Sequence, residues 1–163
     1  MKNLYADIYL GSVLDVTPGL LRAHGAEGLI LDIDNTLIGH NVPIPDETVI
    51  AHLKKLSGDG IKLCVVSNNR ESRVKPFCEK IGVGAFVCNA LKPLRSGYER
   101  ASLCMKLPLS RIAAVGDQVF TDVWGAKRAG CVAILTKPIH NGGEGFFIAL
   151  KRLAEKPFLR GKF

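Results

Sequence analysis

The stretch LILDIDNTLIGHN, residues 29–41, decides the fold prediction for this chain. It begins with apolar residues typical of a strand buried on both faces, and it then places Asp32 and Asp34 on either side of one isoleucine. A single aspartate after a strand is typical of an ordinary turn or helix cap. What the pair does therefore depends on the residues that follow the other predicted strands.

The composition indicates one globular domain, which we expect to span residues 1–163. Hydrophobic residues make up 47% of the chain and charged residues 23%, which excludes a disordered protein. The longest apolar runs are too short to cross a bilayer. The N-terminal stretch contains Asp7 and lacks a signal-peptide cleavage site. We therefore expect a cytoplasmic protein.

The cysteines are too widely spaced to indicate a metal site. They form no C-x-x-C pair and no cluster with the four histidines, so we expect reduced, mostly buried thiols rather than zinc ligands. The five cysteines are Cys64, Cys78, Cys88, Cys104 and Cys131.

Apolar runs alternate with amphipathic stretches along the chain, and this alternation predicts an α/β fold. We expect a doubly wound parallel sheet of about five strands, with a Rossmann-like core and right-handed crossovers. The predicted strands are 28–33, 61–66, 85–88, 111–115 and 131–135. The predicted helices are 46–57, 71–81, 95–106 and 120–129, preceded by a short helix that Thr17 caps and Pro18 opens.

Polar clusters follow four of the predicted strands. They are Asp32–Thr36, Ser67–Arg70, the pair Lys92 and Pro93, and Gly116–Asp122. In open parallel sheets the ligand binds beyond the carboxyl ends of the strands. We therefore expect these clusters to meet at one edge of the sheet.

The chemistry of these side chains favours a magnesium site that binds phosphate. Converging carboxylates repel one another unless a cation lies between them, and hard oxygen ligands favour Mg²⁺. Asp32 and Asp117 are the natural direct ligands, and Asp122 can hold the ion through water. Lys92 supplies a positive charge for phosphate or nucleophile, and Ser67 can donate a hydrogen bond to a phosphate oxygen.

The pair Asp32 and Asp34 suits a reaction that needs an attacking group and a proton carrier. Taken one at a time, the residues of the four polar clusters have simpler explanations. Ser67 fits a helix cap, and Lys92 fits a solvated lysine. Four clusters at one sheet edge favour a functional site.

These motifs resemble the haloacid dehalogenase superfamily of phosphatases. DIDNT (32–36) fits the DxDxT nucleophile motif, and SNN (67–69), the Lys92 segment and GDQVFTD (116–122) fit the second, third and fourth motifs in order. The resemblance covers essentially the whole chain. The segments DVTP, SNNRESRV, LKP and VGDQVFTDVWGAKRAG resemble the YqeG-type branch of subclass IIIA, which is similar to the mitochondrial phosphatidylglycerophosphate phosphatases.

The resemblance implies a role for each reacting residue. Asp32 is the nucleophile that forms an aspartyl-phosphate, and Asp34 is the general acid and then the general base. Lys92 offsets the charge on Asp32 and on the phosphate.

The resemblance also implies the phosphate-binding and metal-binding residues. Ser67 and the amide of Asn68 hold the phosphoryl group, and Thr36 supports the loop in this phosphate-binding set. The metal ion is Mg²⁺, and the residues implied to bind or support it are Asp32, Asp34 (through its carbonyl), Asp117 and Asp122.

The motif spacing leaves no room for the cap domain that often selects the substrate in this superfamily. Residues 37–62 hold a short loop and one predicted helix, and residues 70–91 hold one helix and one short strand. An open site admits a phospholipid headgroup or a macromolecule. It equally allows the partner subunit of a homo-oligomer to act as the lid.

The formal charge of +7 suits an anionic partner. Residues 137–163 carry six lysine and arginine residues against two glutamates. Phe146, Leu150 and Leu153 have helical spacing there, so this segment fits a basic amphipathic helix on a membrane or a last helix covering the sheet. We expect no nucleic-acid partner, because no RNA-reading motif is present.

Three functional hypotheses follow. The first is a Mg²⁺-dependent phosphatase for phosphatidylglycerophosphate, cytoplasmic and peripheral at the inner membrane face. The second is a phosphatase for a soluble nucleotide or sugar phosphate. The third is a binding or assembly protein of low activity on the same fold.

Overall fold

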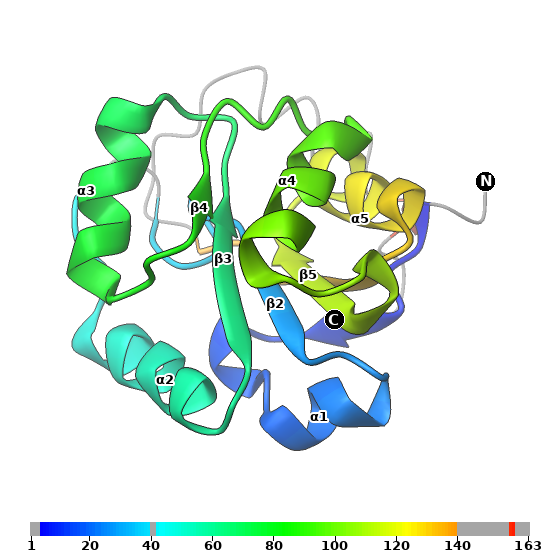
Figure 1. Ribbon diagram of the computed structural model, residues 1–163, viewed down its shortest axis with the longest axis horizontal. Helices are drawn as coiled ribbons and strands as arrows, with labels where there is room; N and C mark the ends of the chain where they lie inside the picture. Colours follow the sequence, from blue (N-terminus) through cyan, green and yellow to red (C-terminus); the bar gives the residue numbers. More distant parts are fainter. Residues whose placement is uncertain (1–3, 40–41, 140–156, 159–163) are drawn as a thin grey trace.

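The computed structural model describes residues 4–39, 42–139 and 157–158, and these residues form a parallel sheet with helices on both faces (Figure 1). The sheet they form has six strands in the order β1-β6-β5-β2-β3-β4, and every neighbouring pair is parallel. The strands are β1 (Ile8–Leu10), β2 (Gly28–Leu31), β3 (Lys62–Val66), β4 (Phe86–Val87), β5 (Ile112–Gly116) and β6 (Val132–Thr136). The predicted α/β class and parallel sheet are confirmed.

All five predicted strands are present, with ends that differ by one or two residues. The edge strand β1 is an addition that the sequence pattern does not predict. It has only three residues, which is too short for a periodic signal. Its place is set by pairing with a distant strand, since Ile8 lies opposite Ile134 of β6.

Helices cover both faces of the sheet (Figure 1). They are α1 (Pro18–Ala23), α2 (Glu47–Gly58), α3 (Glu71–Ile81), α4 (Arg95–Met105) and α5 (Trp124–Ala129). Successive side chains of β2 point to opposite faces of the sheet, and this alternation divides the core into two clusters. Leu29 and Leu31 pack in the cluster that includes residues of α1, α2 and α3, while Ile30 packs in the cluster with residues of α4 and α5.

The helix boundaries confirm the turn chemistry of the sequence. Thr17 accepts a hydrogen bond from the amide of Leu20 and so caps α1. Asp46 caps α2 by accepting from the amide of Thr48 at 2.8 Å. The chain leaves α2 through Gly60, whose φ of +86° is readily adopted only by glycine.

The described residues contain no inserted cap domain. One helix, α2, lies between β2 and β3, and one helix, α3, lies between β3 and β4. None of the described helices has the length and hydropathy needed to span a membrane. The basic amphipathic helix expected around Phe146–Leu153 lies outside the described residues.

Candidate active site

The predicted polar clusters meet beyond the carboxyl ends of the central strands. The register aligns Leu31 of β2 with Val65 of β3 and Val115 of β5, so the residues that follow these strands emerge side by side. They enclose a cavity of about 220 Å³. Its lining residues are Asp32, Asp34, Ser67, Asn68, Asn69, Lys92, Gln118, Thr121 and Asp122.

Lys92 lies at the centre of the site and joins two of the clusters. Its ammonium nitrogen lies 2.5 Å from Oδ1 of Asp32 and 2.7 Å from Oδ1 of Asp122. The lysine is 8% exposed, so these ion pairs are largely shielded from water. The sequence alone suits a solvated lysine at this position, and the structure excludes that alternative.

Burial changes the ionisation of the central pair. It raises the pKa of Asp32 to about 7; the ammonium of Lys92 opposes this shift and the carboxylate of Asp122 adds to it. For Lys92, burial lowers the pKa, but the carboxylates of Asp122 and Asp32 outweigh that effect and raise it above its usual value. Lys92 therefore stays positively charged beside Asp32 at neutral pH.

Asp122 is held rigidly by the turn that carries it. Residues Val119–Val123 form a π-helical turn before α5, and Oδ2 of Asp122 accepts from the amide of Gln118 and the hydroxyl of Thr121, each at 3.2 Å. The buried hydroxyl of Tyr98 donates to the carbonyl oxygen of Asp122 at 3.2 Å. Tyr98 therefore supports the backbone of Asp122, and it lies outside the four sequence motifs.

Gly116 is needed for this close packing. A Cβ atom at this position would lie 2.3 Å from Cγ of Asp122, well inside any real contact distance. The glycine therefore lets the last residue of β5 approach the Asp122 side chain directly.

Asp34 lines the cavity from the loop after β2, and it is held by one residue that precedes α3 and by one residue within it. Nδ2 of Asn69 donates to Oδ2 of Asp34 at 2.7 Å, and the guanidinium of Arg73 forms an ion pair with Oδ1. Sequence analysis does not single out Arg73, although the residue follows the second motif by one helical turn. Its position on the first turn of α3 is the signal that could have identified it.

The second motif has two structural roles. Oγ of Ser67 accepts from the amide of Asn69 at 3.2 Å. Asn68 braces the lysine segment instead, because its Oδ1 accepts from the amide of Lys92 at 2.7 Å and its Nδ2 donates to the Lys92 carbonyl at 3.3 Å. Among the other predicted residues, Thr36 donates to Oδ2 of Asp32 at 3.3 Å.

The carboxylates at this edge fit a divalent cation. Asp32, Asp117 and Asp122 each offer one oxygen, and these three oxygens lie within 4.8 Å of one another. All three donors are hard oxygens, and the carboxylates outnumber the single ammonium of Lys92. This donor set is the one that Mg²⁺ prefers.

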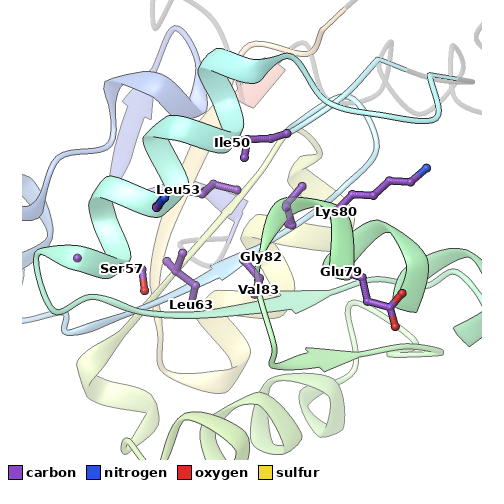
Figure 2. Close-up of a pocket in the computed structure, with 11 residues that line it drawn as sticks. Ile50, Leu53, Ser57, Leu63, Glu79, Lys80, Gly82 and Val83 are labelled. Atoms are coloured by element: carbon purple, nitrogen blue, oxygen red, sulfur yellow. The ribbon is translucent and has the colours of Figure 1, made fainter.

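A larger cavity, of about 570 Å³, lies away from these residues between α2 and α3 (Figure 2). Its lining is mostly apolar, with Ile50, Leu53 and Leu63 among the residues. Of the residues that the structure describes, Glu79 is the one carboxylate that lines it. The described lining of this larger cavity lacks the converging carboxylates and the buried lysine of the cavity of about 220 Å³. The smaller of these two cavities is therefore the better candidate for the active site.

Sequence comparisons connect the chain to phosphatases. The family model of haloacid dehalogenase-like hydrolases matches residues 22–130. The chain is 34% identical over 158 residues to the probable phosphatase YqeG of Bacillus subtilis, covering 97% of this chain and 91% of that protein. It is 27% identical over 152 residues to the chloroplastic/mitochondrial phosphatidylglycerophosphate phosphatase 1 of Arabidopsis thaliana, covering 86% of this chain and 43% of that protein.

Solved structures share the fold at low sequence identity. One is the cobalt-bound deoxy-D-mannose-octulosonate 8-phosphate phosphatase of Haemophilus influenzae, with a TM-score of 0.57, 16% identity, and coverage of 85% of this chain and 90% of that one. Another is the 3-deoxy-D-manno-octulosonate 8-phosphate phosphatase of Moraxella catarrhalis in complex with magnesium and phosphate ions. It has a TM-score of 0.52, 17% identity, and coverage of 88% and 92%.

Proposed function

The chain belongs to the haloacid dehalogenase-like hydrolase family and is a phosphatase, and from that premise we propose that it hydrolyses phosphatidylglycerophosphate to phosphatidylglycerol with Mg²⁺ and through an aspartyl-phosphate. The observation that carries the chemistry is the buried Lys92 ammonium, which contacts Asp32 directly. A carboxylate that attacks an anionic phosphate needs adjacent positive charge, and Lys92 supplies it.

The first half-reaction uses the two aspartates of the first motif. A carboxylate oxygen of Asp32 attacks phosphorus, and the bond between phosphorus and the ester oxygen breaks. Asp34 donates its proton to the departing alkoxide, so the alcohol leaves neutral. The phosphoryl group is then bound to Asp32, with Ser67 and the backbone after it as hydrogen-bond donors.

The second half-reaction reverses the role of Asp34. Its carboxylate takes a proton from water, and the water oxygen attacks phosphorus. The acyl-phosphate bond breaks, inorganic phosphate leaves, and Asp32 is restored as a carboxylate. One group thus acts as acid and then as base, which microscopic reversibility requires of a symmetric two-step cycle.

Four aspartates form the proposed metal site. Asp32, Asp117 and Asp122 supply the clustered oxygens. The family resemblance adds the carbonyl of Asp34 as a further protein ligand. When bound, Mg²⁺ neutralises phosphate charge and polarises the phosphoryl group. Thr36 and Lys92 keep Asp32 in its attacking position.

Two observations support a phospholipid substrate. The name of the plant relative gives phosphatidylglycerophosphate as that protein's substrate, and this chain spans 43% of its length. The described residues also leave the site without a cap domain, so a bulky or membrane-bound phosphate can reach it. Peripheral contact with the inner membrane face and a cytoplasmic location are part of this proposal.

The alternative is a soluble substrate. This class includes nucleotides and sugar phosphates, and the names of two structural neighbours give an octulosonate 8-phosphate as the substrate of those proteins. A homo-oligomer whose partner subunit covers the open site is consistent with either substrate. Light scattering of the purified chain tests that assembly, and limited proteolysis tests the expected single domain of residues 1–163.

A substrate panel tests the proposal. With Mg²⁺, the purified protein should release phosphate from phosphatidylglycerophosphate in micelles faster than from sugar phosphates or nucleotides. Asp32→Asn should lower the rate by at least about 10³-fold, as removal of a covalent nucleophile does. The matched control is Asp59→Asn, an exposed aspartate after α2 that should keep the full rate.

The outcomes separate the hypotheses. Phosphate release from soluble monoesters but not from the lipid overturns the lipid substrate and leaves the soluble one. Full cellular function of an Asp32→Asn strain overturns both and favours a binding or assembly role.

A further inference from the structure

The ion pair between Arg73 and Asp34 links a second cavity to the catalytic one. The second cavity has a volume of about 200 Å³ and lies between α3 and the described residues Ile38, Val42 and Pro43 of the segment after β2. Its apolar lining includes Ile38, Val42, Pro76 and Phe77, and its charged lining consists of Arg73 and Lys80.

Arg73 connects this cavity to the reacting groups. Its guanidinium lines the cavity and also forms the ion pair with Asp34. Under the proposed cycle, Asp34 protonates the oxygen of the leaving alcohol, so Arg73 lies on the leaving-group side of the phosphate. A guanidinium has five N–H donors, and a single ion pair leaves donors for a second anion.

Lys80 gives the cavity its second positive charge. It follows Arg73 by seven residues, two helical turns, and therefore lies on the same face of α3. Lys80 also lines the larger cavity, and Figure 2 shows its side chain extending away from Leu53 and Leu63. Among the described residues, the lining of the cavity of about 200 Å³ holds two cations and no carboxylate, so this cavity is complementary to an anion.

The remaining walls suit hydrocarbon beside that anion. Ile38 and Phe77 are 4% and 5% exposed and form an apolar floor. A free inorganic anion gains nothing from such a floor, whereas an anion on a hydrocarbon chain buries apolar surface there.

We propose that this cavity is a leaving-group subsite in which Arg73 and Lys80 bind a phosphodiester anion carried by the alcohol, a few bonds beyond the scissile phosphate. The subsite rests on the proposed phosphatase cycle, but it does not require that the substrate be a lipid. It makes α3 the element that selects among phosphomonoesters at a site without a cap.

Two soluble substrates test the subsite without a membrane. Glycerol 3-phosphate carries no second anion, and the deacylated headgroup glycerophosphoglycerol phosphate carries the phosphodiester. The measured quantity is the selectivity, the ratio of kcat/KM for the second substrate to kcat/KM for the first. We expect a selectivity of about tenfold for the wild-type protein, as two charge-assisted contacts can provide.

Charge-removing variants on α3 identify the source of that selectivity. Lys80→Gln should lower it about threefold, and Arg73→Gln should lower it further while also reducing kcat, because Arg73 contacts Asp34. The matched control is Lys75→Gln, which removes one exposed charge from the same helix outside the cavity and should leave the selectivity unchanged.

The results distinguish this subsite from the proposed lipid activity. A wild-type selectivity near one, or an equal loss in Lys80→Gln and Lys75→Gln, overturns the subsite even if the micellar lipid is hydrolysed. Selectivity that depends on Lys80, in a protein that does not hydrolyse the micellar lipid, supports the subsite and overturns the lipid substrate. Phosphate release from neither soluble compound overturns the subsite.

Discussion

Replacing Gly116 by alanine should disable the site without removing any functional side chain. The added Cβ would lie 2.3 Å from Cγ, 2.4 Å from Cβ and 2.7 Å from Oδ2 of Asp122. Carbon atoms in contact are normally about 3.5–4.0 Å apart, so Asp122 has to move by more than about 1 Å.

That displacement has two consequences. Asp122 is 6% exposed and is held by Lys92 and by the amide of Gln118, so overpacking should reduce the free energy of unfolding by about 1–3 kcal/mol. A misplacement of about 1 Å near reacting groups lowers the rate by about 10²-fold. Lys92 and the carboxylate cluster should lose their alignment together.

The assay follows hydrolysis of p-nitrophenyl phosphate over a range of Mg²⁺ concentrations, with thermal unfolding measured on the same samples. We expect kcat/KM to fall about 100-fold, more Mg²⁺ to be needed for half-maximal activity, and the Tm to fall by about 2–12 °C. Gly58→Ala is the matched control, since its Cβ would meet nothing within 4 Å. A Gly116→Ala protein with wild-type kcat/KM and wild-type Tm would refute the proposed role of Gly116.

The other predictions concern the buried lysine, the metal ion and the thiols. Lys92→Met should lower the free energy of unfolding by about 3 kcal/mol, because it leaves buried carboxylates without their cation; an unchanged urea midpoint contradicts this. Removal of Mg²⁺ with a chelator should abolish phosphate release, and re-addition should restore it, whereas activity that persists in excess chelator excludes the magnesium site. In the folded protein at pH 8, maleimide should label the exposed Cys104 first. Burial raises the pKa of three other thiols to about 12, so they should react only after unfolding, and fast labelling of the folded protein at those positions would contradict their burial. These thiols are Cys64, Cys78 and Cys131.

Local sequence patterns predict much of the fold because the apolar runs, local hydrogen bonds and backbone preferences agree with the tertiary structure. Strand β2 is an apolar run followed directly by carboxylates, and both its burial and its end are visible in the sequence. The cap at Asp46 and the glycine turn after α2 are likewise local hydrogen bonds and backbone preferences. Strand β1 has no such local signal, since three residues depend entirely on their pairing with β6.

For the site, the sequence determined which residue types follow which strands, and the rule for parallel sheets places their clusters at one edge. The contacts among these residues are tertiary. Asn68 contacts Lys92, and Arg73 pairs with Asp34, although the partners lie far apart in the sequence. The packing of the folded chain brings these partners together, and no local pattern encodes such contacts. The tertiary structure alone therefore decided that Arg73 of α3 joins Asp34 to a second, positively charged cavity.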